Sequence, residues 1–99
     1  HPNYVQSIPT KFYEYIYHGL PILCSDFPLW RSFIERHGCG AVVPPGNAAA
    51  AAEVLHRWRT ESRRYQAYAQ AARQAALKFQ WKRVAPTLVS VYHRLLAGA

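Results

Sequence analysis

The feature that most constrains the fold of this chain is the alternation of short apolar segments with segments of helical character. The apolar runs 22–24 and 40–43 are short, which is typical of strands buried in a parallel sheet. Each run follows a predicted helix, 9–18 or 28–37, and a glycine stands directly after both helices in the usual terminating position. Strands that alternate with helices predict parallel βαβ connections, so the expected fold class is α/β.

Two strands alone do not make a sheet that helices cover on both faces. The 99 residues suffice for one small domain at most, and His1 opens a loop-like stretch. We therefore expect the chain to be a piece of a longer protein, with further strands upstream and a partial Rossmann-like parallel sheet within residues 1–99. An exposed sheet edge predicts a homodimer or poor solubility. A membrane-spanning helix is excluded because no run of about 18 apolar residues occurs.

The predicted strands lie within residues 1–46, whereas residues 47–99 have helical character throughout. Asn47 follows a turn of prolines and glycine, and this position predicts an N-cap. We expect a three-helix tail, with Trp58 and Trp81 as core anchors and with Pro86 in the first turns of the last helix. The apolar stripes at helical spacing are Ala51, Val54, Leu55 and Trp58; Tyr65, Tyr68, Ala69, Ala72, Ala76 and Phe79; and Val84, Leu88, Val91 and Leu95.

The net charge of +7 belongs entirely to the second half of the chain. Residues 1–50 carry three basic and three acidic side chains, whereas residues 51–99 carry nine basic and two acidic ones. This asymmetry suggests nucleic acid, an anionic membrane surface or an acidic partner. Nucleic acid is disfavoured, because Arg63 and Arg64 lie on the opposite side of a helix from Arg73. The side chains that could contact anionic lipid are Arg57, Arg59, Arg63, Arg64, Lys82 and Arg83.

The two cysteines, Cys24 and Cys39, lack the spacing of a zinc site or a redox pair. Apolar or small residues flank both of them. We therefore expect buried free thiols in a reducing compartment and no metal site.

The stretch with the most chemistry-bearing residues is SIPTKFYEYIYHGLPILCSD, residues 7–26. It resembles the C-terminal domain of group 1 nucleotide-sugar glycosyltransferases (glycosyltransferase family 4, which retain the anomeric configuration and have the GT-B fold). The family pattern reads Pro-Thr-Lys, an aromatic residue, Glu-Tyr, Gly-Leu-Pro and Ser-Asp. Here it falls on 9–11, Tyr13, 14–15, 19–21 and 25–26, and 27–31, 34–35, 39–40 and 43–44 also fit.

The resemblance implies a donor site around two glutamates eight positions apart. The second glutamate, which contacts the ribose hydroxyls of the donor nucleotide, falls on Glu14, and a carboxylate suits a pair of vicinal hydroxyls. The first, which contacts the transferred sugar, falls on Gln6; this residue departs from the pattern because its amide carries no charge. Between them the chain enters a helix N-terminus, which suits a diphosphate. The residues assigned to the donor sugar and diphosphate are Gln6, Ser7, Ile8, Pro9, Thr10 and Lys11.

The function that the resemblance implies is transfer of a sugar from a nucleotide-sugar donor to a glycan or lipid-linked acceptor. The setting would be bacterial surface polysaccharide assembly, in the cytoplasm or at the inner face of the membrane, with no cofactor and no metal. The basic pair on the diphosphate and the acceptor site fall outside residues 1–99 in the family pattern. We therefore expect no transferase activity from this chain alone. The alternative is a basic helical module that binds nucleic acid or an anionic membrane surface.

Several side chains of residues 7–26 also have plain structural interpretations. From spacing alone, Glu14 could be a solvated residue paired with Lys11 or His18. His18 suits the C-terminal end of a helix dipole, and Asp26 suits a cap or turn before the second helix. The tyrosines Tyr13, Tyr15 and Tyr17 are more typical of packing than of base stacking.

Overall fold

The computed structural model of the chain describes residues 7–98, and within the last helix it describes the backbone alone for Trp81, residues 83–89, Val91, Tyr92 and Gly98. The elements alternate as predicted in the first half of the chain and are helical in the second. In chain order they are α2 (Thr10–Tyr17), β1 (Ile22–Ser25), α3 (Pro28–His37), β2 (Gly40–Val43), α4 (Ala48–Thr60) and α5 (Ser62–Gly98).

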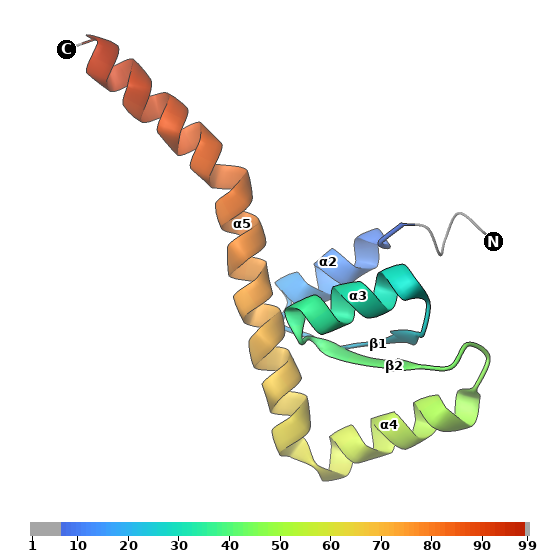
Figure 1. Cartoon of the computed structure of the whole chain (residues 1–99). Coiled ribbons are helices and arrows are strands. Elements are labelled where there is room, and N and C mark those ends of the chain that lie inside the picture. Colours follow the sequence, from blue (N-terminus) through green and yellow to red (C-terminus); the bar gives the residue numbers. More distant parts are fainter. Residues whose placement is uncertain (1–6, 99) are drawn as a thin grey trace.

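The two strands pair in parallel and form the centre of the molecule. Their register runs from Ile22 opposite Gly40 to Ser25 opposite Val43. Helices α2 and α3 lie over one face of this two-stranded sheet, and α4 lies over the other (Figure 1). The predicted α/β class with parallel strands is confirmed, and the arrangement is that of a partial Rossmann-like sheet.

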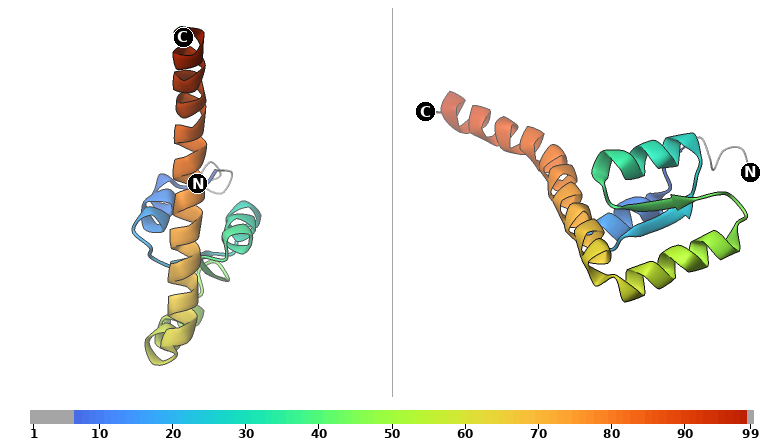
Figure 2. Two further views of the ribbon diagram at one scale, coloured as in Figure 1. Left: turned by 90° about the vertical axis from the view of Figure 1, so that its left-hand side faces the viewer. Right: turned by 60° about the horizontal axis from the view of Figure 1, so that its bottom comes forward.

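The hydrophobic core fills the space between α2, α3 and the amino ends of the strands, where α5 crosses (Figure 2). Phe12 of α2 and Phe33 of α3 meet there with ring centroids 5.7 Å apart. Ala72 and Ala75 line the facing side of α5, and such small side chains allow the helices to approach closely. The buried cluster consists of Phe12, Ile16, Ile22, Phe33, Ile34, Cys39, Ala72 and Ala75.

The predicted end of α3 and start of α4 are confirmed at residue level. Gly38 follows α3 in the left-handed conformation, at φ +60°, and its N–H donates to the Ile34 carbonyl oxygen. At the start of α4 the Asn47 side chain accepts a hydrogen bond from the Ala50 N–H at 2.9 Å, as expected of an N-cap.

The three-helix tail is wrong, because α5 is one continuous helix of 37 residues. Between Phe79 and Pro86 the chain holds good helix formers and no glycine, so nothing terminates the helix there. Proline removes one hydrogen bond and bends a helix without necessarily ending it. Accordingly, α5 changes direction in its orange part (Figure 1).

The structure confirms some residues of the predicted apolar stripes as buried and finds others exposed. Trp58 is buried and contacts the rings of Tyr65 and Tyr68, which confirms it as an anchor of the tail. Leu55 is exposed, so its assignment to the packed stripe is wrong. Leu95 is also exposed. The predictions for Trp81, Val84, Leu88 and Val91 concern side chains outside the described part of the structure.

The molecule is elongated because the outer half of α5 extends beyond the body (Figures 1 and 2). The radius of gyration is 17.6 Å, against about 13 Å for a compact domain of roughly 100 residues. Within residues 7–98 no helix combines the length and the apolar character needed to cross a membrane.

Candidate functional site

Three helices begin at the edge of the sheet where both strands end. Because the strands are parallel and each helix returns the chain across the sheet, α2, α3 and α4 all present their N-termini at the carboxyl ends of β1 and β2 (Figure 1). Ligands of open α/β sheets bind at this edge, and helix N-termini favour anions. The predicted donor segment enters the fold there, at the start of α2.

The segment before α2 is fixed from two sides. The indole N–H of Trp30, on α3, donates to the Ser7 carbonyl oxygen at 2.9 Å. Ile8 is half-buried and packs against the core, and the Pro9 carbonyl oxygen accepts the Phe12 N–H at 3.0 Å. Thr10 and Lys11 are exposed in the first turn of α2, and Gln6 lies outside the described residues.

Glu14 is exposed on α2, one turn beyond Thr10. Among the side chains that the structure describes, the ion pairs are Asp26 with Arg31 and Glu53 with Arg57, so Glu14 pairs with neither Lys11 nor His18. His18 caps the C-terminal end of α2, as expected. The Glu14 carboxylate is therefore open to solvent and to a ligand, and the paired alternative is wrong.

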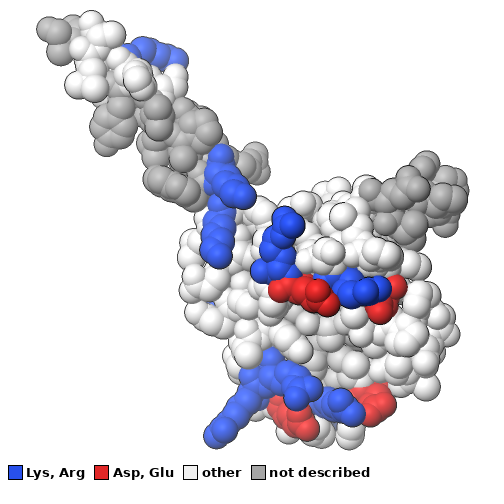
Figure 3. Space-filling model, viewed as in Figure 1, with Lys and Arg blue, Asp and Glu red and all other residues white. Residues whose placement is uncertain are grey.

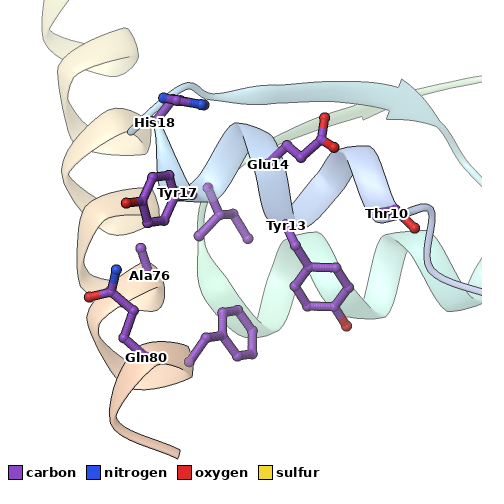
Figure 4. A pocket seen from close by; sticks show the side chains of 9 residues that line it. Thr10, Tyr13, Glu14, Tyr17, His18, Ala76 and Gln80 are labelled. Carbon is purple, nitrogen blue, oxygen red and sulfur yellow. The ribbon is translucent and has the colours of Figure 1, made fainter. Parts of the chain in front are cut away.

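A groove of about 390 Å³ runs between α2 and α5. Figure 4 shows its side chains: Tyr13 projects from α2 on the side opposite to Glu14, whose carboxylate points away from the Tyr13 ring. The Tyr13 and Phe79 rings meet edge to face, with centroids 5.3 Å apart. The groove is lined by Thr10, Tyr13, Glu14, Ile16, Tyr17, His18, Ala76, Phe79 and Gln80.

A second hollow, of about 280 Å³, lies at the carboxyl ends of the strands. Ser25 of β1 and Val43 of β2 form one side, and the turn before α4 with Asn47 forms the other. The hollow opens where α4 begins, so it belongs to the same edge of the sheet as the N-terminus of α2. Sequence reasoning assigned this turn only a capping role.

Asp26 does not cap α3, contrary to the sequence expectation. Phe27 holds the N-cap position, and no side chain bonds the first turn of that helix. Asp26 instead accepts a hydrogen bond from the Arg31 Nε–H, so the carboxylate is engaged with a cation one turn into α3.

Sequence reasoning underestimated the aromatic cluster that supports α2. Phe12 contacts the ring of Trp30 at 5.6 Å between centroids, and Phe33 contacts Tyr13 at 5.5 Å. Tyr13 thus makes the packing contacts expected of it, although 43% of it is exposed. Tyr15 and Tyr17 are 39% and 63% exposed, against the same expectation. The signal that could have identified Phe12 was its position one helical turn before the buried Ile16.

Two thiols and one histidine in or near the core have shifted pKa values. Burial raises the pKa of both thiols, Cys24 and Cys39, to about 11, so both remain protonated and unreactive at neutral pH. They are free thiols, as expected; Cys39 is buried and Cys24 half-buried. Burial and the nearby cations of Arg36, Lys78 and Lys82 lower the pKa of His37. Across the described residues His, Cys, Asp and Glu side chains form no cluster that could hold a metal ion.

Together these features define an α/β domain in which an exposed carboxylate lies one turn into α2, and this helix begins at the edge of the sheet where the strands end. Residues 1–75 match the family model "Glycosyl transferases group 1". This match covers most of the chain and includes every residue of the predicted donor segment, so the chain belongs to the group 1 glycosyltransferase family. No curated protein sequence and no solved structure gives a significant match to the chain.

Proposed function

We propose that this chain supplies the donor-binding side of a retaining glycosyltransferase with the GT-B fold. The family match carries this proposal, because it spans the whole donor segment. The reaction would move a sugar from a nucleotide-sugar to a glycan or lipid-linked acceptor, in bacterial surface polysaccharide assembly in the cytoplasm. It would use no metal, since basic side chains elsewhere in the protein would neutralise the diphosphate. The family match favours this function over a basic module that binds nucleic acid.

In this proposal the nucleotide lies along the first two turns of α2. The N-terminal turn of a helix directs free N–H groups outward, and its dipole favours negative charge. The diphosphate would therefore bind at Thr10 and Lys11 in that turn, and the resemblance assigns Ser7 and Ile8, which lead into it, to the same ligand, whereas Pro9 has no N–H to give. Gln6, whose amide can donate and accept hydrogen bonds, is assigned to the transferred sugar.

Glu14 is assigned to the ribose. It follows Thr10 by four residues, which is about 6 Å along a helix axis, and the ribose hydroxyls of a nucleoside diphosphate lie at a comparable distance from its phosphates. The carboxylate is exposed and forms no ion pair with the side chains that the structure describes, so it can accept a hydrogen bond from each ribose hydroxyl.

The test compares ribose with deoxyribose. Uridine and guanosine diphosphates, and their 2′-deoxy forms, are titrated by calorimetry against the chain and against Glu14→Gln. We expect the chain to prefer the ribose forms and Glu14→Gln to bind them about tenfold more weakly and to lose the preference. Glu35→Gln, which changes an exposed glutamate of α3, is the matched control and should keep it. Equal affinity of the chain and Glu14→Gln for the ribose forms would remove Glu14 from the site.

A further inference from the structure

The segment that leads into α2 has little charge with which to hold an anion. Within residues 7–13 Lys11 is the only charged side chain, whereas the excess of basic side chains lies on α4 and α5 (Figure 3). A diphosphate at this segment therefore depends on backbone N–H groups for most of its contacts with residues 7–13. The orientation of these N–H groups decides how well the segment binds it.

Three backbone N–H groups are available between residues 8 and 11, on Ile8, Thr10 and Lys11, because Pro9 has none. Among the described residues no acceptor takes a hydrogen bond from any of the three. The directions of the Thr10 and Lys11 N–H groups follow from the first turn of α2. Ile8 precedes the helix, so the direction of its N–H needs another support.

Trp30 supplies this support through the peptide bond between Ser7 and Ile8. Its indole N–H donates to the Ser7 carbonyl oxygen at 2.9 Å. The carbonyl and the N–H of a trans peptide lie in one plane and point in opposite directions. Because the Ser7 carbonyl points at Trp30 on α3, the Ile8 N–H points away from the Trp30 ring.

Two local features restrict Ile8 itself. Pro9 follows it and limits residue 8 to extended backbone conformations. The Ile8 side chain is half-buried and packs against the core. The remaining freedom of the segment is rotation of the peptide plane before Ile8, and the bond from Trp30 opposes this rotation.

We propose that Trp30 is a positioning residue for donor binding, which turns the Ile8 N–H toward the diphosphate. This inference rests on the proposed function. Ile8 lies farther from Glu14 along the chain than Thr10 does, so its N–H is assigned to the phosphate farther from the ribose. Trp30 acts through the peptide and does not touch the ligand. The ribose contact of Glu14 is independent of Trp30.

The test measures by calorimetry how strongly the full chain prefers a nucleoside diphosphate to the corresponding monophosphate, with uridine and guanosine nucleotides. Trp30→Phe keeps a ring and removes the N–H. We expect it to reduce this preference about tenfold and to leave the preference for ribose over 2′-deoxyribose unchanged. Trp58→Phe, which changes a buried tryptophan of α4, is the matched control and should keep both preferences.

A second variant removes the proposed donor itself. Ile8→Pro deletes the N–H at a position that is already limited to extended backbone, which proline adopts. Ile8→Ala keeps the N–H, loses the side chain and serves as its control. If Trp30 acts through this N–H, Trp30→Phe should add no further loss of diphosphate preference to Ile8→Pro. Additive losses in the double variant would overturn the proposal.

The other outcomes separate this inference from the proposed function. An unchanged diphosphate preference in Trp30→Phe, or an equal loss of affinity for the monophosphate and the diphosphate, would overturn the positioning role alone. Failure of the unchanged chain to bind any of these nucleotides would contradict the proposed function and the positioning role with it. If Trp30→Phe does not fold, β-(3-benzothienyl)alanine at position 30 repeats the test, because it keeps the bicyclic ring and lacks only the N–H.

Discussion

The indole N–H of Trp30 donates a hydrogen bond to the carbonyl oxygen of Ser7, 23 residues earlier in the chain, at 2.9 Å. This bond connects α3 to the segment that leads into α2. The Trp30 ring also contacts Phe12 and Phe27, with centroids 5.6 and 5.0 Å away. Trp30 therefore joins the proposed diphosphate segment to the packed aromatic cluster, and it positions that segment without belonging to it.

Trp30→Phe separates the hydrogen bond from the ring packing. Phenylalanine keeps an aromatic ring at this position but has no N–H, so the Ser7 carbonyl loses its indole donor. We expect a loss of about 1 kcal/mol in the free energy of unfolding, measured by urea denaturation. Amide hydrogen exchange should quicken at Ile8 and Thr10 and stay unchanged in β1. Unchanged exchange at both amides would show that the bond does not hold the segment.

Gly40 is the residue of β2 that allows the closest approach to β1. A Cβ at this position would lie 1.8 Å from the carbonyl oxygen of Ile22, a backbone atom that a side-chain rotation cannot move away. Gly40→Ala should therefore separate the strands and destabilise the fold by about 3 kcal/mol or more, seen in thermal and urea unfolding.

Gly46→Ala is the matched control for Gly40. Gly46 has φ +73°, but a Cβ added there would meet no atom within 4 Å, so only backbone strain opposes alanine at this position. The expected cost is about 1 kcal/mol. If both substitutions cost the same, the short contact with Ile22 is relieved by a small strand movement.

The first half of the fold could be predicted from sequence because each element there has a local signal. Gly38 ends α3 and Asn47 caps α4, and both residues act on the backbone next to them. The strands could be predicted equally well, since 22–24 and 40–43 are apolar runs between such signals. Local chemistry of this kind does not depend on which elements later pack together.

The tail could not be predicted in the same way, because its outcome depends on competition between signals. Pro86 indicated a helix boundary, but one missing hydrogen bond was not enough to end a helix that good helix formers continue on both sides. Asp26 likewise had the residue type of a cap, yet Arg31 on α3 offers it a cation instead. The sequence shows that a helix boundary at Pro86 and a cap at Asp26 are possible. It does not show whether a competing interaction is stronger.

In the candidate site, too, a local motif could be predicted from the sequence, whereas a long-range contact could not. Glu14 could be singled out by its motif, and the structure adds that its carboxylate is exposed and forms no ion pair with a described side chain. The hydrogen bond from Trp30 to Ser7 could not be predicted, since it joins residues of separate elements. Long-range contacts of this type follow from the packing of α3 beside α2 and leave no pattern in the sequence.

His37 makes the packing of α3 on α5 sensitive to acid. Its ring contacts those of Phe33 and Phe79, with centroids 4.7 and 5.1 Å away. Burial, followed by the cations of Arg36, Lys78 and Lys82, lowers its pKa from the usual 6.5. The unfolded chain therefore takes up the proton at a higher pH than the folded chain does. Stability is unaffected above about pH 6.5 and falls as the pH drops from there toward the folded-state pKa.

His37→Phe removes the titrating group and keeps an aromatic ring beside Phe79. Urea unfolding of the chain and of His37→Phe is compared at about pH 8, 6 and 5. We expect the variant to lose less stability than the unchanged chain between about pH 7 and 5, because it has no proton to take up. His56→Phe, a change on the exposed face of α4, is the control and should follow the unchanged chain. Parallel pH profiles for the chain and His37→Phe would show that His37 does not carry the acid sensitivity.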